Sequence, residues 1–129
     1  MRIKSLALWV ALALGTMNAQ SAVTDKMIEN DAKSPGDILS WGIGQQGQRY
    51  SPLKQVNTQT VGKLVPVWSF SFGGEKQRGQ ESQPLIHDGV MFVTASYSRI
   101  FALDTKTGAK LWKYEHRLPD GIMPCCDVI

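Results

Sequence analysis

The sequence is poor in the side chains that most metal sites use. Histidine occurs twice, at positions 87 and 116, and cysteine twice, at the adjacent positions 125 and 126. Two distant histidines and an adjacent cysteine pair lack the spacing of zinc ligands. The sequence therefore predicts no metal site within this stretch of chain.

The chain also lacks an apolar run of the ~20 residues that a membrane-spanning helix requires. The run Leu6–Leu14 follows Arg2 and Lys4 and precedes a small, polar stretch that ends near Ala22. A basic start, a short apolar run and small residues are typical of a secretory signal peptide. We expect residues 1–22 to be that signal, cleaved between Ala19 and Ala22, with no membrane anchor left afterwards.

The net charge gives no reason to expect a nucleic-acid partner. The formal charge of +3 falls to +1 once Arg2 and Lys4 are removed with the leader, so the basic balance belongs partly to the signal. Export would also place Cys125 and Cys126 in an oxidising compartment.

Short strands joined by tight turns dominate the second half of the chain. Asp88-Gly89 suits a two-residue hairpin turn, and the stretch Asp104–Gly108 supplies Asp and Thr oxygens that can cap turn amides. A four-stranded antiparallel meander of this kind is the unit of a β-propeller blade. The predicted strands are 84–87, 90–94, 99–103 and 109–114.

The first half predicts short elements around a glycine-rich turn. Thr24 can cap a helix that ends near Lys33, and Asn57 can cap a helical turn that ends near Leu64. Alternation over residues 65–72 predicts a strand with Trp68, Phe70 and Phe72 on one face. The stretch Trp41–Gly47 spells the G-x-G-x-x-G dinucleotide fingerprint, but Pro52 follows where a helix should open, which favours a plain turn.

Two tryptophans suggest a repeat. Trp68 and Trp112 lie 44 residues apart, and the residues before them loosely echo each other. The spacing matches the ~40–50-residue period of propeller repeats. We therefore expect Trp112 to dock between neighbouring blades.

The motif Ala102-Leu103-Asp104-x-x-Thr107-Gly108-x-x-Leu111-Trp112 resembles the tryptophan-docking repeat of the quinoprotein alcohol dehydrogenases, which use pyrroloquinoline quinone (PQQ). The resemblance implies an all-β fold in which residues 23–129 form part of an eight-bladed β-propeller: about one four-stranded blade plus the strand that enters the ring. Two further stretches, 72–79 and 118–124, look most like the ethanol-type branch. Other stretches that resemble family motifs, in the right order, are 49–53, 79–85, 88–94 and 125–127.

The resemblance assigns three cofactor-binding residues. Cys125 and Cys126 match a vicinal pair whose disulfide forms a wall against the PQQ ring; the alternative is two free or intermolecularly bonded thiols. Glu81 matches a glutamate that hydrogen-bonds the cofactor edge; the alternative is a solvated loop carboxylate.

The function implied by the resemblance is periplasmic oxidation of primary alcohols to aldehydes. It would use PQQ with Ca²⁺ or a lanthanide, and pass electrons to a periplasmic cytochrome c. The family's catalytic aspartate and metal ligands lie downstream of the cysteine pair, so we expect no catalytic residue here and no activity from the 129-residue chain alone. Two alternatives are a non-catalytic exported propeller scaffold and a short exported binding module. Glu81 and the cysteine pair favour the enzyme, because a scaffold has no use for a cofactor wall.

Overall fold

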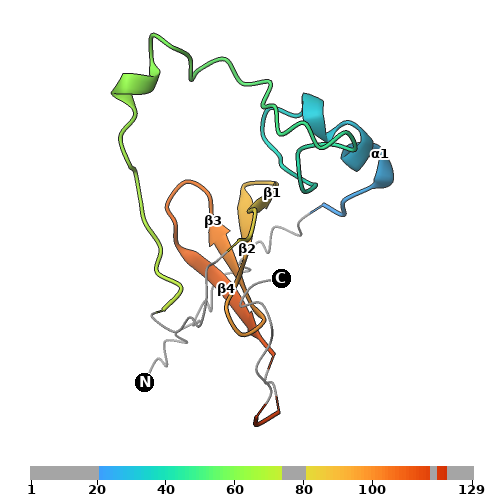
Figure 1. Cartoon of the computed structure of the whole chain (residues 1–129), viewed down its shortest axis with the longest axis vertical. Coiled ribbons are helices and arrows are strands. Elements are labelled where there is room, and N and C mark those ends of the chain that lie inside the picture. Colours follow the sequence, from blue (N-terminus) through green and yellow to red (C-terminus); the bar gives the residue numbers. More distant parts are fainter. Residues whose placement is uncertain (1–20, 74–80, 117–118, 122–129) are drawn as a thin grey trace, which may run out of the picture.

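A four-stranded antiparallel sheet forms the centre of the computed structural model, which describes residues 21–73, 81–116 and 119–121 (Figure 1). Neighbouring strands follow the order of the sequence, β1-β2-β3-β4. The four predicted strands are confirmed, each boundary within one residue. Their bounds are β1 Leu85–His87, β2 Val90–Ala95, β3 Arg99–Asp104 and β4 Lys110–Glu115.

The two turns predicted from sequence have the expected backbone. Asp88 and Gly89 both have positive φ, 50° and 75°, as a two-residue hairpin turn requires. In the β3–β4 turn, the Asp104 carboxylate accepts hydrogen bonds from the Thr107 hydroxyl and from the amides of Lys106 and Thr107. These bonds, above all those from Thr107, hold the pKa of Asp104 below its ordinary value. Gly108 closes the turn with φ 71°.

The predicted strand at 65–72 is wrong, although its alternation is right. This stretch forms no strand, because it lies across a face of the sheet and does not pair with a strand edge among the described residues. Val65 and Val67 point away and are 74% and 82% exposed. Trp68, Phe70 and Phe72 pack on the buried cluster of Ala95, Phe101 and Leu103.

The helices are shorter than predicted. Thr24 caps α1 (Asp25–Glu29) by accepting the Met27 amide at 3.3 Å, which confirms the predicted start. The predicted continuation to Lys33 is instead a separate 3₁₀ turn, η1 (Asp31–Lys33), in which Asp31 is drawn inward and fully buried. The second predicted helical turn is reduced to η2 (Val61–Lys63), whose N-cap position is Thr60 without a side-chain cap bond. Asn57 Oδ1 instead accepts the amides of Gln59 and Thr60 in the turn just before it. Among the described residues, no helix is long and apolar enough to cross a membrane.

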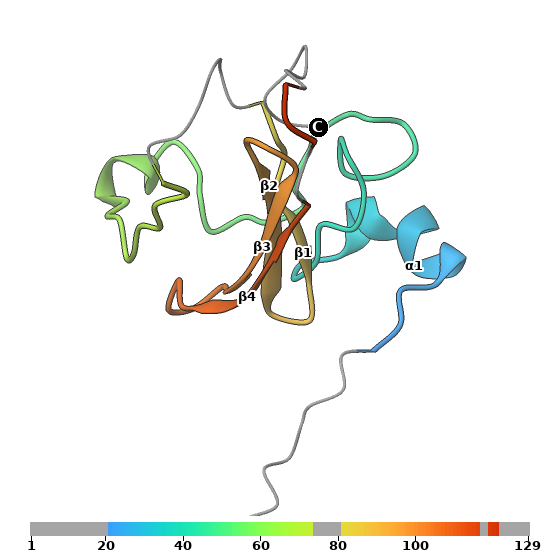
Figure 2. The same cartoon turned by 90° about the horizontal axis from the view of Figure 1, so that it is seen from below.

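The segment after η1 covers the outer edge of β1. Ile38 and Ile86 exchange two backbone hydrogen bonds of 2.8 Å, and Asp37 accepts the Asp88 amide at 3.1 Å. Figures 1 and 2 show α1 and this loop on the β1 side of the sheet, while the chain that carries η2 swings away from it. An edge strand that would otherwise expose its amides is thereby paired.

Candidate functional site

Glu81 lies in the irregular segment that leads into β1, and its side chain is exposed. The two residues after it are tethered. The Ser82 hydroxyl donates to the Thr94 carbonyl at 3.1 Å, and the Gln83 side chain bonds to the loop at Ser40 and Gly42. Glu81 is thus an acceptor-only carboxylate on an anchored backbone, open to a ligand with hydrogen-bond donors.

The other two predicted cofactor-binding residues, Cys125 and Cys126, lie outside the described residues. Their disulfide and their proximity to Glu81 stay predictions. In the described part of the chain, no three His, Cys, Asp or Glu side chains gather as metal ligands would.

The glycine-rich turn uses its amides internally. The Gly42 N–H is donated to Gln83 Oε1 at 3.1 Å, that of Gly44 to the Ser40 hydroxyl at 2.7 Å, and that of Gly47 to the Gly44 carbonyl at 3.0 Å. A pyrophosphate site needs such amides free and aimed at the ligand. These hydrogen bonds support the interpretation of the fingerprint as a turn.

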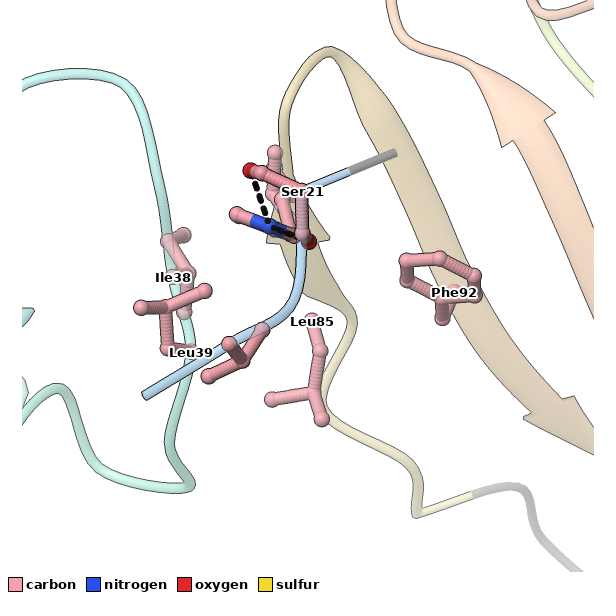
Figure 3. Close-up of a pocket in the computed structure, with 8 residues that line it drawn as sticks. Ser21, Ile38, Leu39, Leu85 and Phe92 are labelled. Carbon is pink, nitrogen blue, oxygen red and sulfur yellow. Dashed lines mark hydrogen bonds between the residues drawn. The ribbon is translucent and has the colours of Figure 1, made fainter. Parts of the chain in front are cut away.

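His87, to which the sequence assigned no role, lies beside an apolar cavity of about 290 Å³ lined by Ile38, Leu85 and Phe92 among others (Figure 3). Its Nε2 is 2.8 Å from the Ser21 carbonyl and 3.2 Å from the Ser21 hydroxyl. Its Nδ1 is 3.3 Å from Asp37 Oδ2.

This serine, histidine and aspartate do not make a hydrolytic triad. A carbonyl only accepts, so Nε2 must donate its proton to Ser21 O and is not a base toward the Ser21 hydroxyl. The bond to Ser21 and the Asp37 carboxylate together raise the pKa of His87 above its ordinary value, against the effect of burial. In the chain that retains residues 1–22, the cluster therefore joins the N-terminal segment to the sheet.

Trp68 docks on the β3–β4 turn, a contact that was not predicted from the sequence. Its indole Nε1–H donates to the Thr105 carbonyl at 3.0 Å. Its ring lies so close to Gly108 that a Cβ there would be 2.6 Å from ring carbons Cδ2 and Cε3. Gly108 therefore serves two needs, the positive φ and the close approach of the indole.

Trp112, for which docking was expected, is 46% exposed. Its docking stays a prediction. The loose echo between the residues before Trp68 and those before Trp112 was the signal that could have identified Trp68 as the docked residue of this turn.

A four-stranded antiparallel sheet whose last turn holds the tryptophan of a preceding repeat defines one blade of a tryptophan-docked β-propeller. The family model described as "Glucose/ethanol/alcohol dehydrogenase, beta-propeller domain" matches residues 39–124. The chain belongs to this PQQ β-propeller family.

Named relatives agree with this family. The chain is 62% identical to a quinoprotein ethanol dehydrogenase of Pseudomonas aeruginosa, over 92% of this chain and 19% of the relative. It is 58% identical to a 1-butanol dehydrogenase (quinone) of Thauera butanivorans, over 95% of this chain and 20% of the relative. A europium-containing methanol dehydrogenase superposes with a TM-score of 0.65 at 33% identity, covering 74% of this chain and 17% of that one. The chain spans about one fifth of the length of the curated relatives it matches.

Proposed function

We propose that the chain is the N-terminal part of a periplasmic PQQ-dependent dehydrogenase that oxidises primary alcohols to aldehydes. The observation that carries the proposal is the 62% identity to a quinoprotein ethanol dehydrogenase over 92% of this chain. The basic, apolar and small-residue pattern of residues 1–22 supports export.

In this proposal the chain supplies one part of the cofactor site. Glu81 accepts a hydrogen bond from a donor on the cofactor edge, and the Cys125–Cys126 disulfide covers one face of its ring system. The exposed, acceptor-only carboxylate of Glu81 on its tethered segment fits that role. When bound, PQQ accepts the two electrons removed from the alcohol.

The remaining partners belong to parts beyond these residues. The relatives named for ethanol and 1-butanol support a primary alcohol as substrate. The europium-containing neighbour supports a metal ion, Ca²⁺ or a lanthanide, beside the cofactor. A periplasmic cytochrome c is the proposed electron acceptor.

Exposed apolar side chains support the view that this blade packs against further structure. Most of those in the described part of the chain lie between residues 41 and 67, and a solvated surface rarely gathers so many. Those between residues 41 and 67 are Trp41, Tyr50, Leu53, Val56, Val61, Leu64, Val65 and Val67.

A chimera tests the proposal. This chain replaces the 121 matched residues of the P. aeruginosa dehydrogenase. We expect the apo-chimera to bind PQQ and, once loaded with PQQ and Ca²⁺, to reduce an electron-accepting dye with ethanol. The isolated 129-residue chain should not do so. A chimera that does not bind PQQ, or an isolated chain that oxidises ethanol, would contradict the proposal.

Two variants of the chimera test the role of Glu81. Loss of a hydrogen bond to a charged group costs about 1.5–3 kcal/mol, so Glu81→Ala should raise the Kd for PQQ roughly 10- to 100-fold. The matched control is Glu29→Ala, which removes an exposed carboxylate at the end of α1 and should leave the Kd unchanged. Equal effects of the two substitutions on the Kd would show that Glu81 does not bind the cofactor.

A further inference from the structure

A buried carboxylate organises the loop beside β1. Asp31 is fully buried and accepts three hydrogen bonds: from the Leu39 amide at 2.9 Å, the Ser40 amide at 3.0 Å and the Ser40 hydroxyl at 2.6 Å. A carboxylate is buried at tolerable cost only when its lone pairs are satisfied in this way. The loop around Ser40 is therefore held at a fixed place relative to η1.

Gln83 connects that loop to the segment that carries Glu81. Its Oε1 accepts the Gly42 amide at 3.1 Å, and its Nε2 donates to the Ser40 carbonyl at 3.3 Å. Three residues further on, Ile38 and Ile86 hold the same two segments together through their backbones. The Gln83 amide thus extends the contact between the loop and β1 past the end of the sheet.

Two side chains help to fix residues 81–84, which precede the first residue of β1. β1 begins at Leu85, so this segment has irregular backbone. The Ser82 hydroxyl bonds to β2, at the Thr94 carbonyl, and the Gln83 amide bonds to the loop, at Ser40 and Gly42. The Ser82 and Gln83 side chains thus tie the two residues after Glu81 to two different parts of the fold, β2 and the loop around Ser40.

We propose that Gln83 is a positioning residue for the cofactor: the Asp31–Ser40–Gln83 hydrogen-bond relay sets the place of the Glu81 carboxylate and thereby the affinity for PQQ. This inference rests on the proposed function. It assigns a binding role to a side chain that does not touch the cofactor, and it extends the site to a buried aspartate 50 residues upstream of Glu81.

The test is a double-mutant cycle in the full-length chimera, read out as the Kd of the apo-protein for PQQ in an absorbance titration. We expect Gln83→Ala to raise the Kd about tenfold, a change in binding free energy of the size that one hydrogen bond contributes. In the Glu81→Ala background the same substitution should change the Kd less than about twofold, because the carboxylate through which Gln83 acts on the cofactor is then absent. A merely structural role would give equal effects in both backgrounds.

A conservative variant and a control complete the experiment. Gln83→Glu keeps the acceptor for the Gly42 amide but replaces the donor to the Ser40 carbonyl by repulsion, so its Kd should lie between those of the parent and Gln83→Ala. Ser34→Ala removes a hydroxyl that accepts the Asp37 amide at 3.0 Å in the same loop, and should leave the Kd unchanged.

Two results overturn the inference. One is an unchanged Kd in both Gln83 variants; the other is a Gln83→Ala effect that persists in the Glu81→Ala background. A parent chimera that fails to bind PQQ overturns the proposed function itself, and this distinguishes the two failures.

Discussion

Replacing Gly108 with alanine should destabilise the β3–β4 turn. The free-energy cost can be worked out from the contact with the docked Trp68. Alanine at φ 71° costs about 1–2 kcal/mol in the left-handed region. Its Cβ would lie 2.6 Å from the Trp68 ring, well inside the ~3.5–4.0 Å of a normal carbon contact. The indole must retreat and its bond to Thr105 O must weaken, which adds about 2–3 kcal/mol. The total is about 3–5 kcal/mol.

Native-state hydrogen exchange in the full-length chimera measures this opening locally. The amides of Asp104 and Gly108 are bonded across the turn, to Ala109 O and Asp104 O, both at 2.9 Å. Their exchange should accelerate roughly 100- to 4,000-fold in Gly108→Ala, since each 1.4 kcal/mol is a factor of ten. Gly62→Ala is the control. Gly62 has open space at its Cβ position and no positive φ, so the turn should not respond.

The refuting result comes from combining Gly108→Ala with Trp68→Ala. Without the indole the overlap disappears, and only the backbone cost of about 1–2 kcal/mol should remain for Gly108→Ala. If Gly108→Ala costs the same with and without Trp68, the close approach is not what requires glycine, and the reasoning fails.

Two further predictions concern the edges of the blade. In the precursor that still carries residues 1–22, the raised pKa of His87, due first to its bond to Ser21 and then to Asp37, means that its stabilisation is complete below pH ~6.5 and is lost as pH rises through the folded-state value. The measurement is the hydrogen-exchange protection of peptide 85–95, corrected for intrinsic exchange, in the parent and in a His87→Gln variant. The excess protection of the parent should shrink between about pH 6 and about pH 9. A pH-independent difference would contradict this. Trp112 and Tyr114 are similarly exposed here, at 46% and 52%. In the full-length chimera Trp112→Ala should nonetheless cost about 3–5 kcal/mol and Tyr114→Ala below about 1 kcal/mol, because we expect Trp112 alone of the two to dock on a neighbouring blade; equal costs would show that Trp112 does not dock.

The strands of the blade were predictable because their signals are local. Asp88-Gly89 and Asp104–Gly108 each carry a turn within a few residues, and the strands between them alternate or run apolar. The observed strands accordingly depart from the predicted ones by no more than one residue.

The stretch 65–72 shows why pattern alone was insufficient elsewhere. Period-two alternation reports which side chains face inward, and Trp68, Phe70 and Phe72 do. A strand also needs a partner for its backbone, and alternation contains no information about partners. The same limit applies to Asp31 and Gln83, whose hydrogen bonds join residues eight to 43 positions apart. Of the candidate site, only Glu81 lies among the described residues, and its role came from the resemblance.

The docking of Trp68 defines what Trp112 requires. An indole of this kind needs a turn with a carbonyl for its Nε1–H and a glycine beneath its ring, as Thr105 and Gly108 provide for Trp68. That turn is already occupied, so a second copy of this chain cannot receive Trp112 there. We therefore predict that Trp112 docks on a different turn, in a further repeat of the full-length protein that we propose. A chain that covers about one fifth of its relatives' length leaves ample sequence for such a repeat. Under the proposed function, we therefore expect the exposed face of β4 to pack against a following blade of the full-length protein and not against a second copy of this chain.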